Sequence, residues 1–147
     1  MSLPAPVGGS PTRGHPPALE RAAQLYARAG ENGVLWFALA AVARDRRAAR
    51  VVLAALLANT AVKQVVRRPR PMLGPELPPL AATVSGLSYP SAHAATSFAA
   101  AGALSLPSAP LYAAAGAMAL TRPYLGVHYP SDVLAGAALG AALGKLL

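Results

Sequence analysis

Long apolar stretches, separated by short breaks rich in arginine or proline, constrain the fold of this chain more than any other feature. The second stretch, Ala48–Val66, is close to the roughly 20 apolar residues that a helix needs to cross a bilayer. The other stretches are shorter and need their flanks to span. They cover residues 33–43, 92–106, 111–120 and 133–147. The sequence therefore predicts an all-α bundle of about four to five apolar helices.

The scarcity of charge favours a membrane over water as the surroundings of this bundle. Only 12% of the 147 residues are charged and 54% are hydrophobic, whereas an ordinary soluble domain has about 25% charged residues. Gly136, Gly140 and Gly144 follow each other at the spacing that lets membrane helices pack closely. We expect a membrane-spanning bundle, and a soluble alanine-rich bundle is the alternative.

The N-terminal part of the chain differs from the rest. Residues 1–17 are rich in Pro, Gly and Ser and show no helical or strand period, which predicts a disordered tail. Residues 18–30 alternate apolar and polar residues with the period of an amphipathic helix. This helix suits a membrane interface or a place against the bundle, and both positions stay open. One domain is expected over residues 18–147.

The basic balance narrows the function classes. Thirteen Lys and Arg face five Asp and Glu, for a net charge of +8. The arginines lie in tight groups between apolar runs, which favours membrane flanks and a phosphate site over a nucleic-acid surface. The chain has no cysteine, which excludes a disulfide scaffold and thiolate chemistry. With no HExxH motif and a single acidic residue near the histidines, neither a metal nor another cofactor is expected.

Polar residues that interrupt the apolar runs are the candidates for chemistry. Lys63 lies near the end of the second stretch, and Arg70 follows it. Read alone, these basic residues would equally suit anchors at the lipid head groups. Ser91 is placed to cap the third stretch, where Ala92 lets an anion approach the free N–H groups and His93 lies in the first turn.

A further cluster contains Arg122, His128 and Asp132. Asp132 is expected in the first turn of the last helix, reaching back to His128. A carboxylate on one ring nitrogen would fix the tautomer and leave the other nitrogen as a nucleophile. A histidine–aspartate pair without chemistry at a helix cap is the alternative. Taken together, three cations suit a phosphate, and two histidines allow one nucleophile and one general acid.

These clusters resemble the type 2 phosphatidic acid phosphatase (PAP2) superfamily, which also includes the vanadium haloperoxidases. The family motifs K-x6-RP, PSGH and SR-x5-H-x3-D match in order and in internal spacing. Two residues depart from them: Ala92 replaces the usual Gly, and Thr121 replaces the usual Ser. The matching segments are Lys63-x6-Arg70-Pro71, Pro90-Ser91-Ala92-His93 and Thr121-Arg122-x5-His128-x3-Asp132.

The resemblance implies a PAP2-like membrane bundle and a metal-independent reaction. It implies that His128 attacks phosphorus to form a phosphohistidine, and that Asp132 orients it. His93 would protonate the leaving alkoxide and then activate water. The residues that it implies for holding the phosphate are Lys63, Arg70, Arg122, Ser91 and the backbone N–H groups of Ala92 and His93.

A phosphatase with its site at the ends of membrane helices would take a lipid phosphate as substrate. Residues 88–98 (SYPSAHAATSF) are similar to the actinobacterial enzymes proposed to act on decaprenylphosphoryl-5-phosphoribose. Phosphatidic acid, phosphatidylglycerol phosphate and undecaprenyl diphosphate stay open. So do two other functions: a soluble acid phosphatase or haloperoxidase of the same superfamily, and a non-enzymatic membrane protein that binds anionic lipids.

Charge also predicts the placement in a membrane. The turn 44–50 carries four arginines and one aspartate among its residues, which by the positive-inside rule makes it cytoplasmic. The next helix then puts the site on the outer face of a bacterial plasma membrane. The proline-rich loop 71–90 is expected to gate entry of the lipid.

Overall fold

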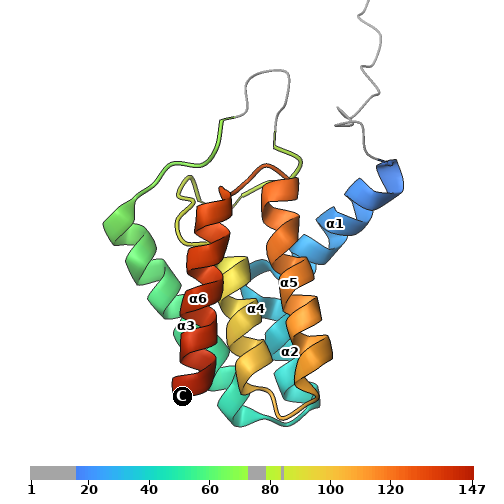
Figure 1. Cartoon of the computed structure of the whole chain (residues 1–147), viewed down its shortest axis with the longest axis vertical. Coiled ribbons are helices and arrows are strands. Elements are labelled where there is room, and N and C mark those ends of the chain that lie inside the picture. The colour runs from blue at the N-terminus through green and yellow to red at the C-terminus, as the bar shows by residue number, and fades with distance from the viewer. Residues whose placement is uncertain (1–15, 73–78, 84) are drawn as a thin grey trace, which may run out of the picture.

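A computed structural model describes residues 16–72, 79–83 and 85–147 of the chain, and helices dominate it (Figure 1). Over these ranges the β-structure is one isolated bridge, between Pro69 and Leu87. The predicted all-α fold is confirmed. Most of the predicted tail, 1–15, lies outside the described residues. The helices are α1 (Pro17–Ala29), the 3-10 turn η1 (Glu31–Gly33), α2 (Val34–Val42), α3 (Arg46–Val66), α4 (Ala92–Ala103), α5 (Ser108–Tyr124) and α6 (Pro130–Leu146).

Polar side chains fix the starts of two of these helices. The Asp45 carboxylate accepts a hydrogen bond from the Ala48 N–H at 2.9 Å and so caps α3. The Ser91 hydroxyl accepts one from the Ala94 N–H at 3.4 Å and caps α4, as its sequence position predicts. Each cap satisfies a backbone donor that the first turn of a helix leaves without a partner.

Helix α5 is longer than the apolar stretch 111–120 from which it was predicted. It begins at Ser108, because Pro110 falls in the first turn, where a missing N–H breaks no helical hydrogen bond. It continues through Thr121 and Arg122 to Tyr124. Arg122 is therefore part of a helix and is buried at its end, rather than following the helix in a loop.

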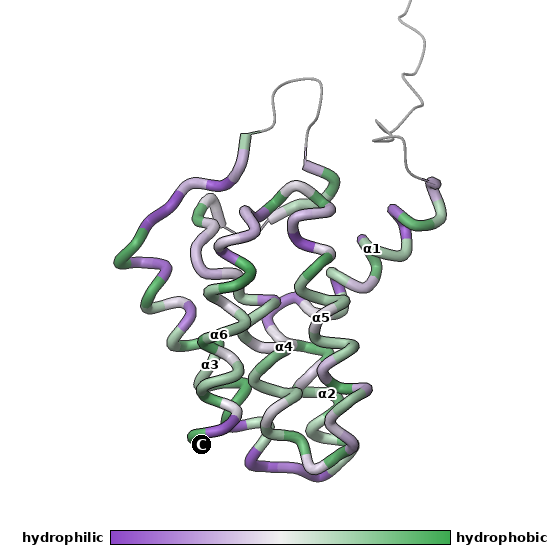
Figure 2. The backbone as a smooth tube through the Cα atoms, viewed as in Figure 1, coloured by the Kyte–Doolittle hydropathy of each residue, from purple (hydrophilic) through white to green (hydrophobic). Residues whose placement is uncertain are grey.

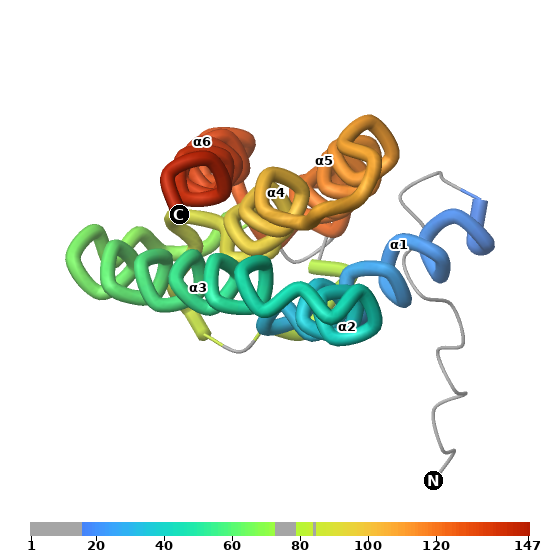
Figure 3. The backbone as a smooth tube through the Cα atoms, turned by 90° about the horizontal axis from the view of Figure 1, so that it is seen from below, coloured from blue at the N-terminus to red at the C-terminus, as the bar shows by residue number. Residues whose placement is uncertain are grey.

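Helix α4 forms the centre of the bundle and packs against α3, α5 and α6 (Figure 3). Its buried residues are mostly alanines, which allows its neighbours to come close. The predicted glycine stripe of α6 lies on this contact: a Cβ on Gly140 would overlap the Ala95 carbonyl, and one on Gly144 would lie 2.9 Å from the Ala99 oxygen. Small residues thus set the separation of the two helices.

The helices keep apolar side chains on the outside as well as in the core. Leu57 is 62% exposed, and Leu134 is 71% exposed. Within the part of the chain that the structure describes, α3 is the one helix long and apolar enough to cross a membrane by itself. Hydrophilic segments gather toward the two ends of the bundle (Figure 2). The two ends are therefore the polar regions of the fold.

Two side-chain hydrogen bonds connect the second half of helix α1 to the rest of the chain, and Glu20 in its first half is buried as well. The Tyr26 hydroxyl donates to the Ala114 carbonyl at 2.8 Å, and the Gln24 amide donates to the Leu80 carbonyl at 2.9 Å. Its first half projects away from the other helices (Figure 1). Packing on the bundle, one of the two predicted positions, thus applies to the second half. A place at a membrane interface stays a prediction for the first half.

Candidate active site

A cavity of about 600 Å³ lies where α3 ends and α4 begins. It gathers polar side chains from both helices, from the end of α1, from the loop before α4 and from the segment before α6. All the predicted site residues except Ser91 and Asp132 line it. Those that do are Lys63, Arg70, Ala92, His93, Arg122 and His128.

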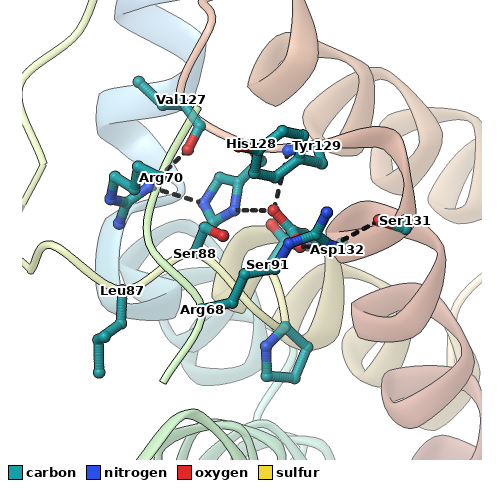
Figure 4. Close-up of polar contacts among 12 residues, drawn as sticks. Arg68, Arg70, Leu87, Ser88, Ser91, Val127, His128, Tyr129, Ser131 and Asp132 are labelled. Carbon is teal, nitrogen blue, oxygen red and sulfur yellow. Dashed lines mark hydrogen bonds and ion pairs between the residues drawn. The ribbon is translucent and has the colours of Figure 1, made fainter. Parts of the chain in front are cut away.

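The loop between α3 and α4 holds Arg70 in place by closing on itself. The Arg70 N–H donates to the Gly86 carbonyl at 3.3 Å, and its Nε donates to the Ser85 carbonyl at 2.7 Å. The far end of the guanidinium reaches the segment before α6, where Nη1 donates to the Val127 carbonyl at 2.8 Å (Figure 4). The guanidinium is thereby fixed beside the cavity. The predicted gating role of loop 71–90 stays a prediction, because residues 73–78 and 84 lie outside the described ranges.

The hydrogen bonds of His128 define its tautomer. Arg70 Nη1 lies 3.1 Å from His128 Nε2 (Figure 4). Since a guanidinium can only donate, Nε2 must be the nitrogen with the lone pair. The proton of the neutral ring is then on Nδ1, which lies 3.6 Å from a carboxylate oxygen of Asp132. This is the arrangement predicted from the sequence, in which the carboxylate leaves the other nitrogen available to attack.

Burial keeps this imidazole neutral. His128 is only 4% exposed, and burial lowers its pKa from the ordinary 6.5 to about 2, with further lowering by the positive charges of Arg70 and Arg122. A neutral ring retains the lone pair that a nucleophile needs. The His128 ring is therefore neutral at neutral pH, with the lone pair on Nε2.

Asp132 is positioned by a network of its own. One carboxylate oxygen accepts the Tyr129 N–H at 2.8 Å, which completes the cap of α6, and the other accepts Arg68 Nη1 at 3.0 Å. The side chain is fully buried. Because Asp132 is held on both oxygens, it gives His128 a fixed negative partner behind the ring rather than a ligand for the cavity.

His93 is oriented by helix α1. Its Nε2 lies 2.9 Å from the Ala27 carbonyl oxygen. A carbonyl only accepts, so Nε2 must carry the proton. The neutral ring then has its lone pair on Nδ1, which can exchange a proton with a substrate. Sequence reasoning did not find this contact, because no pattern connects Ala27 to His93.

Two cationic side chains that line the cavity have hydrogen-bond donors left for a ligand. Arg122 is 4% exposed, and its Nε has no hydrogen-bond partner among the described residues. Lys63 Nζ makes one long contact, to the Leu87 carbonyl at 3.5 Å. A buried cationic donor without a protein partner, such as Arg122 Nε, is costly unless a ligand uses it, and the half-buried Lys63 ammonium also has donors left. Their number and positive sign suit a phosphate.

The other motif residues lie within or next to helices, and their hydroxyl groups bond to the backbone of the same helix. The Ser91 hydroxyl faces its own helix as the cap of α4, outside the cavity lining, so its predicted contact with phosphate stays a prediction. Ala92, at the first position of α4, does line the cavity. The Thr121 hydroxyl donates to the Met118 carbonyl at 2.7 Å, inside α5. The exchange of Ser for Thr at this position therefore leaves the catalytic side chains in place.

Arg68 is a residue of the site that sequence reasoning missed. Its guanidinium donates to Asp132 and to the Ser131 hydroxyl at 2.8 Å, and it stacks 4.1 Å from the centre of the Tyr129 ring (Figure 4). In the sequence it is one of several neighbouring arginines that suit membrane anchors equally well. Only the fold singles it out as the partner of the carboxylate.

Acidic and histidine side chains do not gather into a metal site in the part of the chain described. Within these ranges no group of three or more His, Asp or Glu side chains is placed to hold a metal ion. Metal independence stays a prediction that an assay has to test.

Comparisons with known proteins agree with this geometry. The sequence profile of the PAP2 superfamily matches residues 46–147. The decaprenylphosphoryl-5-phosphoribose phosphatase of Mycobacterium tuberculosis (strain CDC 1551 / Oshkosh) is 38% identical, over 89% of this chain and 80% of that protein. The protein of the same name from Mycolicibacterium smegmatis is 39% identical, over 82% of this chain and 72% of that protein.

Two crystal structures share the fold. Aquifex aeolicus LpxE superposes with a TM-score of 0.70 at 25% sequence identity, covering 91% of this chain and 87% of that one. The transmembrane PAP2 type phosphatidylglycerolphosphate phosphatase from Bacillus subtilis gives a TM-score of 0.65 at 23% identity, covering 92% and 78%. The predicted family and the predicted membrane bundle are confirmed.

Proposed function

This chain belongs to the PAP2 superfamily and is a lipid phosphatase, and we propose that it removes the phosphate monoester of a polyprenyl-linked sugar phosphate through a phosphohistidine at His128. The observation that carries the proposal is the bond from Arg70 Nη1 to His128 Nε2. It supports Nε2 as the attacking nitrogen, because a phosphate bound by Arg70 would lie beside its lone pair.

The first step is capture of the phosphate. Its oxygens would lie among Lys63, Arg70 and Arg122, near the N-terminus of α4, where the free N–H groups favour an anion. Arg70 Nη1 would turn from His128 Nε2 to a phosphate oxygen. That movement releases the lone pair at the point where phosphorus arrives, so that binding itself activates the nucleophile.

The second step is transfer of the phosphoryl group. The lone pair of His128 Nε2 forms a bond to phosphorus, and the bond from phosphorus to the leaving oxygen breaks. His93 Nδ1 takes up a proton when the phosphate and its negative charge enter the cavity. His93 then gives this proton to the leaving alkoxide and releases the alcohol. The three cations balance the charge on the equatorial oxygens. The Asp132 carboxylate stabilises the positive charge that develops on the His128 ring.

The third step is hydrolysis. His93, now neutral, takes a proton from water, and the oxygen of that water attacks phosphorus. The bond from phosphorus to His128 Nε2 breaks, and inorganic phosphate leaves. Both histidines thereby return to their starting forms. The chain itself supplies every group that these steps require.

The substrate class is supported by the two mycobacterial relatives, whose name specifies a decaprenylphosphoryl-5-phosphoribose. We place the enzyme in a bacterial plasma membrane with the cavity on the outer face. The opposite end of the bundle carries the arginine-rich turn 44–50, and such turns stay in the cytoplasm.

The test is phosphate release by the full chain, purified in detergent, from a polyprenyl-phosphoryl phosphopentose in the presence of EDTA. We expect turnover that vanadate inhibits, and we expect His128→Ala to lose at least about 10⁴-fold in kcat. Arg50→Gln, on the exposed face of α3 near the other end, is the matched control and should retain full activity. A fully active His128→Ala variant, or no turnover by the wild type, would overturn the proposal.

A further inference from the structure

In the described part of the candidate active site, one carboxylate lies in a cavity that is lined by several cationic side chains. Of the described residues that line the cavity, Glu31 is the only acidic one. The cationic residues that line it are Arg28, Lys63, Arg70 and Arg122. A carboxylate repels a phosphate and so weakens the phosphate site. Glu31 is therefore better suited to contact a part of the substrate other than the phosphate.

The position of Glu31 indicates which part. It opens the turn η1, directly after Gly30, and a Cβ on Gly30 would lie 3.2 Å from the His93 ring carbon Cδ2. The turn is therefore packed on His93, the residue assigned to protonate the leaving oxygen. Asn32, in the left-handed region at φ 51°, continues the turn along the cavity wall.

The geometry of phosphoryl transfer indicates on which side of the cavity the leaving alcohol lies. In phosphoryl transfer, the attacking and leaving atoms lie roughly in line on opposite sides of phosphorus. His128 occupies the attacking side, so the leaving alcohol lies on the side of His93. The Glu31–Asn32 turn, which is packed next to His93, consequently faces the leaving alcohol and not the transferred phosphate.

We propose that Glu31 and Asn32 recognise hydroxyl groups that the leaving alcohol carries close to the ester oxygen, which makes the enzyme selective for phosphomonoesters of such alcohols and selective against diphosphates. This inference rests on the proposed function. A carboxylate accepts hydrogen bonds from two neighbouring hydroxyls, and the Asn amide can both donate and accept. The leaving group of a diphosphate carries its charged phosphorus directly on the leaving oxygen and would meet the Glu31 carboxylate with like charge. In a polyprenyl-phosphoryl phosphopentose the sugar hydroxyls lie between the reacting ester and the phosphodiester.

The placement of Glu31 also limits the harm that it does to phosphate binding. The carboxylate is half-buried and interacts electrostatically with the Arg122 guanidinium. The Arg122 guanidinium thus offsets part of the negative charge that Glu31 brings to the cavity.

The test compares three soluble substrates with the full chain in detergent: ribose 5-phosphate, butyl phosphate and butyl diphosphate. The first leaves as a polyol, the second as a plain alcohol and the third as an anion. We expect Glu31→Gln to lower kcat/KM for ribose 5-phosphate about tenfold, because a hydrogen bond to a charged group is lost. For butyl phosphate, the same variant should keep kcat/KM within about twofold of the wild-type value. Its kcat/KM for butyl diphosphate should rise relative to that for butyl phosphate.

Asn32→Ala serves as the second variant and should lower kcat/KM for ribose 5-phosphate about threefold, again without an effect on butyl phosphate. Equal changes on ribose 5-phosphate and butyl phosphate in both variants would overturn the inference, since they would indicate a general effect on the site. Failure of the proposed function would look different: the wild type itself would release no phosphate from any of the three substrates.

Discussion

The two ends of the helix bundle contain the same types of residue but use them differently. At the end opposite the cavity, the Arg47 guanidinium donates to three backbone carbonyls, those of Ala103 at 2.9 Å, Gly144 at 3.2 Å and Leu147 at 3.1 Å. At the catalytic end, Arg122 is more deeply buried, yet its Nε has no partner among the described residues. Arg47 therefore connects the C-terminal ends of α4 and α6, whereas Arg122 has a donor left for a ligand.

The carboxylates of the two ends differ in their neighbours. Asp45 divides its two oxygens between the N–H groups of Ala48 and Ser105, and so joins the start of α3 to the end of α4. Asp132 also caps a helix, but it adds an ion pair with Arg68 and lies behind the His128 ring. Unused donors therefore distinguish the two arginines, whereas both carboxylates are satisfied and differ in the charged groups beside them.

Replacing one arginine at each end should produce opposite effects, and this is the largest difference that we expect. Arg122→Ala should lower kcat by about 10²- to 10³-fold, the usual effect of removing a group that stabilises transition-state charge. Arg47→Ala should leave kcat unchanged and lower the free energy of unfolding by about 1–3 kcal/mol, because hydrogen bonds from a charged group are lost. Phosphate release and thermal unfolding in detergent measure the two effects. A loss of stability without loss of activity in Arg122→Ala would contradict this division.

Substitutions of Arg68 test whether this residue affects catalysis through its ion pair with Asp132. Arg68→Gln removes the charge partner of a buried carboxylate, which should let His128 shift. We expect kcat to fall about tenfold with little change in KM, as for other partners that orient a functional histidine. Arg68→Lys should recover part of the rate. An increase in KM alone would instead indicate that Arg68 binds the substrate.

The glycines of α6 allow the two ends to be disturbed separately. A Cβ on Gly136 would press on the Ser91 carbonyl at the start of α4, whereas one on Gly144 would press on Ala99 and Gly102 at its far end. Each Ala variant should lose about 1–3 kcal/mol of stability through overpacking. Only Gly136→Ala should also lose activity, by a few fold.

The matched control for these variants is Gly116→Ala in α5, where an added Cβ meets no atom within 4 Å. It should gain about 0.5–1 kcal/mol from helix propensity alone. Unfolding midpoints and initial rates, measured on the same preparations, provide the comparison. Equal losses of activity in Gly136→Ala and Gly144→Ala would show that the ends are coupled.

The smallest expected difference is in pH dependence. The folded protein holds the pKa of His128 at about 2 against 6.5 ordinarily, so below pH 6.5 the unfolded chain binds a proton that the folded chain does not. This contribution should lower stability as the pH falls from 6.5 toward 2. Hydrogen bonds from Ala48 and Ser105 lower the pKa of Asp45 below its ordinary 3.8, so the opposite end should lose stability only as the pH falls through and below that value.

Unfolding midpoints of the wild type and His128→Asn between pH 7 and 5 measure the first effect. The variant cannot titrate at this position, so its midpoint should fall less over this range. Equal slopes in the two proteins would contradict the neutral, buried state of His128.

The sequence predicted the parts of this molecule that depend on local pattern. Apolar runs and caps such as Ser91 gave the helices, and the spacing of the motifs gave the candidate residues, because each motif lies within a short segment whose local structure fixes its side chains. The end of α5 was less predictable. Pro110 suggested a break, although a proline in the first turn is compatible with a helix.

What the sequence could not supply are the contacts between segments far apart in the chain. The bond from His93 to Ala27 spans 66 residues, and that from Arg68 to Asp132 spans 64. Neither follows from periodicity, since Ala27 contributes a backbone carbonyl and Arg68 is one of several similar arginines. Glu31 likewise appears near the catalytic residues only once α1 folds back on the bundle. Tertiary packing decides which polar residues meet.

The central claim is that His128 carries the phosphoryl group, and trapping the covalent intermediate tests it most directly. His93→Ala should slow hydrolysis of the intermediate more than its formation when the substrate is an activated ester, p-nitrophenyl phosphate, whose leaving group needs no general acid. Rapid quenching in base followed by peptide mass spectrometry should then find an acid-labile phosphoryl group on His128 Nε2. A phosphoryl group on another residue, or turnover with no covalent adduct on His128, would contradict the account.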